Sequence, residues 1–208
     1  MKKGLGELGV DVSNTVIDKF RTYIKILYDY KHRLHLLSHK DYNRISLKHF
    51  LPSLMILKYL SYEKNACDIG AGAGFPSIPV KILKPEINFT LFESVKKKAH
   101  FLEVLIQELE LSGIKVEPTR AENYEGEKFD LILIRAAGKV KDLVRTIDRL
   151  ILPQGRAIFY KSAAVETEIR QAEENLFKLN FAYSIERVTT PIKKIPMALI
   201  FLNKKWYQ

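Results

Sequence analysis

Four residues spaced two apart could hold a nucleotide-like cofactor: Asp68, Gly70, Gly72 and Gly74. They follow a short apolar run that predicts a strand and precede residues 78–83, which predict a helix. Glycine suits such a turn because the backbone visits positive φ angles, and a missing Cβ lets a ligand lie against the main chain. The first amide groups of the helix would then face the ligand.

The spacing of these glycines does not fit a dinucleotide. An NAD fingerprint has its third glycine at the sixth position, but here Phe75 is sixth from Gly70 and Gly74 comes one residue early. NAD-dependent oxidoreduction is therefore a distant alternative. The pattern Asp-x-Gly-x-Gly-x-Gly instead resembles that of class I methyltransferases, which bind S-adenosylmethionine. Residues 89–92 predict a second strand ending at Glu93, whose carboxylate can accept both ribose hydroxyls.

Length and composition indicate a globular protein. With 208 residues, of which 47% are hydrophobic, the chain is long enough for one domain with a short extension. It has no apolar run long enough to span a membrane, and we expect a cytoplasmic monomer. Cys67 is the one cysteine, so it forms no disulfide and no cysteine metal site. The net charge of +10 favours a polyanionic partner, although solubility explains part of it.

The chain divides into a helical extension, residues 1–62, packed on a main domain, residues 63–208. Ser13 or Asn14 caps a first helix whose apolar residues are three and four apart. Residues 28–49 are basic and histidine-rich, which fits either a solvated face or a phosphate-contacting surface. Their histidines lack carboxylate or cysteine partners at ligand spacing, so we expect no metal. Pro52 starts a new helix at residues 53–60.

In the main domain, predicted strands and helices alternate. After the strand at 89–92, Ser94 caps a helix that runs to residue 111. Strands follow at 114–116, 129–134 and 156–160, and helices at 139–151 and 165–179. This order predicts an α/β fold with a doubly wound, mostly parallel sheet. Strands at 181–189 and 198–203 have only a short connection and should pair antiparallel, as a C-terminal hairpin.

In such a sheet a ligand lies beyond the carboxyl ends of the strands, which adds Ala121, Glu122 and Arg135 to the candidate site. Amino-group methyltransferases often have an Asp/Asn-Pro-Pro-aromatic turn after the fourth strand, and cytosine C5 enzymes use a Pro-Cys nucleophile. This chain has neither. Two roles stay open for Arg135: contact with the substrate, or an ion pair with Glu122 or Glu93.

Motifs along nearly the whole chain resemble the bacterial small-subunit ribosomal RNA guanine-N7 methyltransferase family, also called glucose-inhibited division protein B. They are His-Phe-Leu-x-Ser-Leu at 49–54, Asp-Ile-Gly-Ala-Gly-Ala-Gly-Phe-Pro at 68–76, Ile-Pro at 78–79, Phe-Glu-Ser at 92–94, Lys97, Phe-Leu at 101–102, Arg-Ala-Glu at 120–122 and Arg-Ala at 135–136. The resemblance implies an S-adenosylmethionine-binding set of Gly70, Phe75, Ala121, Glu122 and Arg135. It also implies methylation of a guanine N7 in 16S rRNA, free or in a precursor of the small ribosomal subunit.

Guanine N7 carries a lone pair and no proton, so catalysis needs positioning rather than a general base. Arg135 and Lys161 are the candidates for that positioning. The candidate RNA contacts are Arg33, His35, Lys48, His49, Lys97 and Lys161, with Phe75 and Tyr160 as candidate aromatic supports for the base.

The chain departs from the family pattern at several positions. The family usually has Asn-Leu-Thr at residues 35–37, Asp at Pro52, Gly at Ser77 and Gly at Ser162, where this chain has His35, Leu37 and the residues just named. These departures leave open a different RNA or small-molecule acceptor, or a module that binds the cofactor without catalysis.

Overall fold

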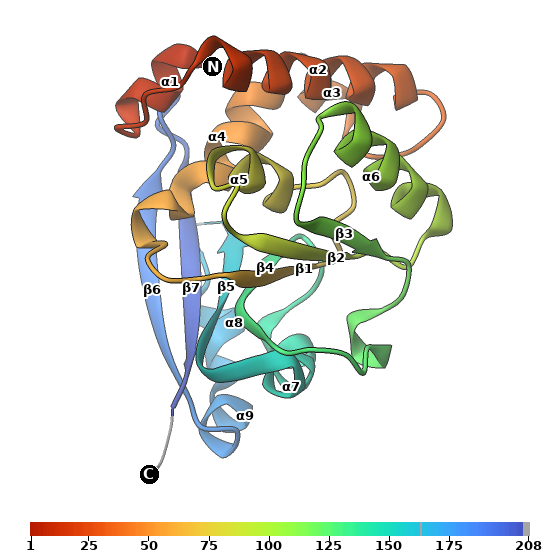
Figure 1. Cartoon of the computed structure of the whole chain (residues 1–208). Helices are drawn as coiled ribbons and strands as arrows, with labels where there is room; N and C mark the ends of the chain where they lie inside the picture. The colour runs from red at the N-terminus through yellow and green to blue at the C-terminus, as the bar shows by residue number, and fades with distance from the viewer. Residues whose placement is uncertain (163, 206–208) are drawn as a thin grey trace.

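The computed structural model of the protein describes residues 1–162 and 164–205. Within them lies a seven-stranded sheet in the order β3-β2-β1-β4-β5-β7-β6 (Figure 1). Its parallel strands are β1 (Asn65–Ile69), β2 (Asn88–Phe92), β3 (Ile114–Glu117), β4 (Phe129–Arg135) and β5 (Ile151–Lys161). The order reverses between β1 and β4, which places a ligand crevice beyond the end of β1.

The predicted antiparallel hairpin is present. Strands β6 (Phe181–Thr189) and β7 (Pro196–Lys204) pair antiparallel, and β7 also pairs antiparallel with β5. A connection of six residues joins them, too short for a crossover helix.

Helices cover both faces of the sheet (Figure 1). One face carries α2 (Asn14–Tyr30), α5 (Ser77–Leu83) and α6 (Lys96–Glu108), and the other carries α7 (Val140–Leu150), α8 (Glu166–Arg170) and α9 (Glu173–Lys178). In α7, for example, Val140, Leu143, Val144 and Ile147 are buried at spacings of three and four, so one stripe of the helix packs on the strands.

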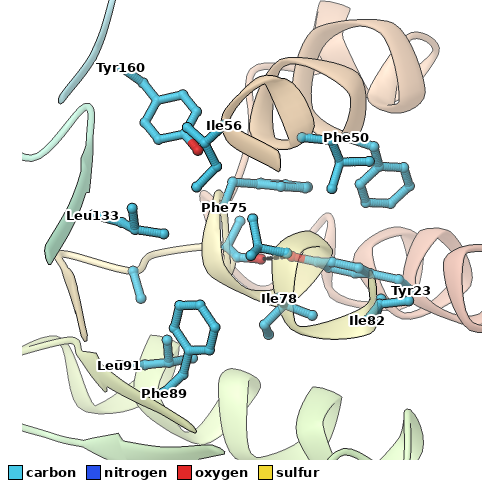
Figure 2. Packing of buried hydrophobic residues seen from close by; sticks show 14 of the residues in the cluster. Tyr23, Phe50, Ile56, Phe75, Ile78, Ile82, Phe89, Leu91, Leu133 and Tyr160 are labelled. Carbon is cyan, nitrogen blue, oxygen red and sulfur yellow. Dashed lines mark hydrogen bonds between the residues drawn. The ribbon is translucent and has the colours of Figure 1, made fainter. Parts of the chain in front are cut away.

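The N-terminal extension contains α1 (Lys2–Glu7), α2, α3 (His39–Tyr42) and a continuous helical stretch. That stretch is a π-helical turn η1 (Ser46–Phe50), then α4 (Leu51–Ser53), then a 3₁₀ helix η2 (Leu54–Tyr59). Tyr23 of α2 and Phe50 of η1 share a hydrophobic core with Phe75 and Ile78 beside the glycine turn (Figure 2). The extension therefore packs directly on the segment that follows β1.

Several predicted boundaries were wrong. The helix predicted to start after Pro52 is part of a helical stretch that begins at residue 46, because Arg135 supplies a donor to the carbonyl of Lys48 that the proline cannot reach with an N–H. Ser94 does not cap α6: Val95 is the N-cap, with no side-chain cap bond. The helix predicted at 165–179 is two short helices, β5 starts five residues before the predicted strand, and α1 was not predicted. At α2 the cap is Ser13, whose hydroxyl accepts from the N–H of Val16.

Candidate active site

The segment after β1 is a tight turn held by β2 and by Glu93. The N–H of Gly70 donates to the carbonyl of Phe92 over 2.9 Å, and the N–H of Gly72 donates to Oε2 of Glu93 over 3.0 Å. The other carboxylate oxygen of Glu93 accepts from the N–H of Val95 over 2.8 Å. Glu93 thus joins the glycine turn to the start of α6. Each of its oxygens has a second lone pair, which leaves the carboxylate able to accept from ribose hydroxyls.

The turn requires glycine for two different reasons. Gly72 has a φ of +54°, and a Cβ built there would come no closer than 3.8 Å to another atom, the carbonyl oxygen of Gly70. The space beside Gly72 is therefore open to a ligand. Gly74 has a φ of +92°, and its Cβ would lie 2.6 Å from the hydroxyl oxygen of Tyr23. That hydroxyl donates to the carbonyl of Ala73 over 2.6 Å (Figure 2). The absence of a side chain at Gly74 therefore leaves room for this bond between α2 and the turn.

A cavity of about 380 Å³ lies at the amino ends of β1 and β2, beside Asn65 and Asn88, and the glycine turn does not line it. The turn lines a cavity of about 320 Å³, which we call the proximal cavity. Its wall includes the main chain of residues 70–73, and its side chains include Leu36, Leu37, His49, Phe75, Glu93 and Lys98. Open space beside glycine, a carboxylate on the next strand and an apolar rim fit an adenosine-type cofactor.

Asp68 lies behind the turn rather than in the proximal cavity. It is fully buried, and its Oδ2 accepts from the hydroxyl of Ser77 over 2.6 Å. Burial raises the pKa of Asp68 to about 7, although the bond from Ser77 opposes that rise. Asp68 was predicted to bind the cofactor. In this structure its carboxylate links the end of β1 to the start of α5.

Arg135, at the end of β4, points into the N-terminal extension. Its guanidinium donates to the carbonyls of Lys48 (2.7 Å) and His49 (3.1 Å) and to the hydroxyl of Ser53 (3.0 Å). Pro52 lacks the N–H that would donate to the carbonyl of Lys48, four residues earlier, and Arg135 supplies that donor. Of the two roles left open for Arg135, its side-chain bonds do not show the ion pair with Glu122 or Glu93. Its acceptors are main-chain carbonyls and a hydroxyl of the helical stretch, so Arg135 fixes η1 against the sheet.

His49 lies in the wall of the proximal cavity and stacks on Phe75, with ring centroids 4.9 Å apart. Burial, and then the charge of Arg135, lowers the pKa of His49 to about 4, so the imidazole is neutral near pH 7. Its Nδ1 lies 3.4 Å from Nη2 of Arg135. Because arginine can only donate, Nδ1 is the acceptor and the proton sits on Nε2, which faces a carboxylate oxygen of Asp41 at 3.6 Å.

The two aromatic candidates for supporting a base are both buried. Phe75 is 6% exposed, stacked 5.3 Å from Tyr23, with the guanidinium of Arg135 5.7 Å from its centroid. Tyr160 is 5% exposed, and its hydroxyl donates to the carbonyl of Ser53 over 2.9 Å. Each ring forms part of a cavity wall, and neither is an exposed platform.

The remaining predicted residues are spread around this end of the sheet. Ala121 is buried and its carbonyl accepts from Arg149, Glu122 is exposed, and neither lines the proximal cavity. Lys161 pairs with Glu168 over 2.8 Å and donates to the carbonyl of Gly138 over 2.7 Å. The other candidate RNA contacts outside the proximal cavity are exposed: Arg33, His35, Lys48 and Lys97.

Another cavity, of about 360 Å³, adjoins the proximal cavity. We call it the distal cavity. Arg135 and Ala136 line both cavities, so they form the common wall. The distal cavity is otherwise lined by Lys48, Pro52, Tyr160, Lys161, Ile195 and Met197, among others.

The family model described as rRNA small subunit methyltransferase G matches residues 16–195. A Streptococcus agalactiae protein named Ribosomal RNA small subunit methyltransferase G is 36% identical over 178 residues, which cover 82% of this chain and 75% of that protein. A protein of the same name from Geobacillus sp. is 31% identical over 208 residues, covering 96% and 87%. The chain belongs to the rRNA small subunit methyltransferase G family.

Solved structures share the fold. A methyltransferase from Pyrococcus furiosus matches with a TM-score of 0.62 and 14% identity, over 91% of this chain and 99% of that one. The tRNA (m1A58) methyltransferase TrmI from Aquifex aeolicus matches with a TM-score of 0.56 and 15% identity, over 75% and 68%. The predicted class I methyltransferase fold and the family predicted from the motifs are both confirmed, and with them a methyltransferase that uses S-adenosylmethionine.

Sequence reasoning missed some residues of the proximal cavity. Leu36 was not predicted as part of the wall, because only the packing of the extension brings it to β1. Lys98 had a signal, since three successive lysines at the start of a helix are unfavourable for the helix dipole. Tyr23 was not singled out, because the sequence marks its helix only as amphipathic. Among residues 1–162 and 164–205, the structure has no cluster of three or more His, Cys, Asp or Glu suited to a metal, and no helix long and apolar enough to cross a membrane.

Proposed function

We propose that this protein methylates N7 of a guanine in small-subunit rRNA. The observation that carries the proposal is the chemistry of the proximal cavity. Its ionisable side chains are His49, Glu93, Lys98 and Arg135. The ring lone pair of His49, on Nδ1, faces Arg135, Glu93 is bonded to two main-chain amides, and Arg135 is turned into the extension. A wall without an available general base fits an acceptor atom that carries no proton.

The chemistry needs alignment more than proton transfer. S-adenosylmethionine, held against Glu93 and the open side of Gly72, would supply an electrophilic methyl group. The lone pair of N7 would accept that group without losing a proton, and the base would gain the positive charge. The residues of this chain have to place N7, carbon and sulfur in line and exclude water. Exposed cations beside N7 would oppose the developing charge, and the bonds of Arg135 hold its guanidinium on the carbonyls of η1.

The cofactor contacts follow from the walls of the cavity. The carboxylate of Glu93 would accept from the ribose hydroxyls, and the open side of Gly72 would take the body of the cofactor. Phe75 and His49 form one stacked wall. RNA would approach over the basic extension, in line with the net charge of +10. We infer a cytoplasmic monomer that acts on 16S rRNA or on a precursor of the small subunit.

The test incubates purified protein with methyl-labelled S-adenosylmethionine and either unmethylated 16S rRNA transcript or small ribosomal subunits that lack the modification. Digestion and mass spectrometry then identify the labelled nucleoside. We expect 7-methylguanosine at one position. No label in either RNA, or label on another base, would contradict the proposal, and cofactor turnover that is insensitive to RNA would indicate a small-molecule acceptor instead.

A further inference from the structure

The distal cavity adjoins the proximal cavity, and a methyl acceptor must lie next to the bound cofactor. Arg135 and Ala136 line both, at the carboxyl end of β4, next to the switch point of the sheet. A methyl group held in the proximal cavity would meet its acceptor where the two cavities adjoin, with the guanidinium of Arg135 held on the carbonyls of η1. We propose that the distal cavity receives the unstacked acceptor base of a single-stranded RNA segment, with Lys48 at its rim contacting a backbone phosphate. This inference rests on the proposed function.

The walls of the distal cavity suit the faces and edge of a base. Pro52, Met197 and the ring of Tyr160 provide apolar surface, and the volume of about 360 Å³ lies within the range of small-molecule sites. Thr190 is 1% exposed, and its Oγ1 accepts from the N–H of Ile195 over 3.1 Å. Since that bond uses a lone pair of the oxygen, the hydroxyl proton stays available to donate to an acceptor atom on a base edge. Apolar surface for the faces of a base, with polar groups such as the Thr190 hydroxyl at its edge, is typical of pockets that hold a base taken out of a stack.

The two lysines at the rim differ in what they can do. Lys161 pairs with Glu168 and donates to the carbonyl of Gly138, so its charge is partly neutralised and it fixes the segment after β4. Lys48 is exposed, while its own carbonyl is fixed by Arg135. Its main chain is therefore held and its ammonium faces solvent beside the cavity. We assign the phosphate contact to Lys48 and not to Lys161.

A matched pair of substitutions in the β6–β7 connection tests the pocket. Ile195 lines the distal cavity and is half-buried, so Ile195→Trp should fill it. Ile192→Trp makes the same change three residues earlier, at an exposed position outside the cavity lining. The assay measures kcat and KM for unmethylated 16S rRNA, and the Kd for S-adenosylmethionine by calorimetry.

Ile195→Trp should lower kcat/KM for RNA by about 5- to 150-fold, the equivalent of about 1–3 kcal/mol for one stacked base. Its Kd for S-adenosylmethionine should match the wild type, which also shows that the variant is folded, and Ile192→Trp should resemble the wild type in both. Unchanged RNA kinetics in Ile195→Trp would overturn the proposal, as would a loss confined to cofactor binding, which would assign the cavity to the cofactor. If the wild type methylates no RNA, the proposed function itself fails, and that result is separate from any effect of the pair.

The phosphate contact has its own test. Lys48→Ala should weaken RNA binding. It should also reduce the magnitude of the slope of log K for RNA binding against log salt concentration by about 1, as expected for the loss of one phosphate contact. The control is Lys178→Ala, an exposed lysine on α9, on the opposite face of the sheet. A salt dependence for Lys48→Ala equal to that of the wild type would refute the assignment of Lys48.

Discussion

Replacing Arg135 with methionine should destabilise the protein and loosen the cofactor site together. Methionine keeps the unbranched stem of the side chain but has no hydrogen-bond donor. The carbonyl of His49 and the hydroxyl of Ser53 therefore lose their bonds to the guanidinium. These two bonds are partly buried, and the bond to the carbonyl of Lys48 is exposed to solvent. The hydroxyl of Ser53 still donates to the carbonyl of His49 over 2.6 Å, so both groups keep one partner. The cost is then that of two bonds from a charged donor, about 1.5–3 kcal/mol each, and we expect a loss of about 3–6 kcal/mol in the free energy of unfolding.

The assay is urea unfolding of wild type and variant, followed by calorimetry with S-adenosylmethionine under conditions where both are folded. We expect a higher Kd in the variant, because η1 carries His49 into the wall of the proximal cavity. The control is Arg156→Met. Arg156 also ties a buried site, donating to Glu63 and to the carbonyl of Tyr59, but it lies outside the lining of both cavities. It should lose stability without losing cofactor affinity.

Two results would refute this reasoning. A free energy of unfolding for Arg135→Met within about 0.5 kcal/mol of the wild type, the ordinary range for surface changes, would mean that the bonds to η1 do not matter. Equal losses of cofactor affinity in Arg135→Met and Arg156→Met would mean that affinity follows global stability rather than the position of η1.

Three further predictions follow from the site. Gly72→Asp should abolish S-adenosylmethionine binding in calorimetry, because its side chain would occupy the open space beside the turn at a φ of +54°; unchanged affinity would contradict the placement of the cofactor. Burial raises the pKa of Asp68 from 3.8 to about 7, so its contribution to the free energy of unfolding is complete below pH 4 and is lost as the pH rises to 7, by at most about 4 kcal/mol. In urea unfolding, Asp68→Asn should therefore show a smaller fall in the free energy of unfolding between pH 4 and pH 7. His49 has its pKa lowered from 6.5 to about 4, so its contribution is complete above pH 6.5 and is lost as the pH falls to 4, and His49→Gln should remove that opposite slope. If either variant keeps the pH dependence of the wild type, the corresponding pKa shift is absent.

The parts of the site that the sequence could predict are those specified by neighbouring residues. The glycine turn after β1, the carboxylate at the end of β2 and the alternation of strands and helices all follow from local patterns. The antiparallel hairpin followed from the length of one connection. Boundaries were less secure where helix types change, as at residues 46–59, or where one apolar pattern spans two short helices, as at 165–179.

The rest depended on contacts between distant parts of the chain. For Arg135 the sequence left open substrate contact or an ion pair with an acid, but its partners include main-chain carbonyls 86 and 87 residues earlier, which no charge pattern reveals. Asp68 belongs to the cofactor motif, yet it faces Ser77 and not the cavity. Tyr23 holds the glycine turn from a helix that the sequence marks only as amphipathic. The packing of the extension assigns the roles of Arg135 and Tyr23, and the packing of α5 against the end of β1 assigns that of Asp68.

The most direct test of the central claim is a crystal structure of the protein with S-adenosylmethionine. We expect the ribose hydroxyls within hydrogen-bond distance of the carboxylate of Glu93, the cofactor against the open side of Gly72, and the methyl group directed at the wall formed by Arg135 and Ala136. Cofactor density elsewhere, for example in the cavity beside Asn65 and Asn88, or a ribose that does not meet Glu93, would contradict the account.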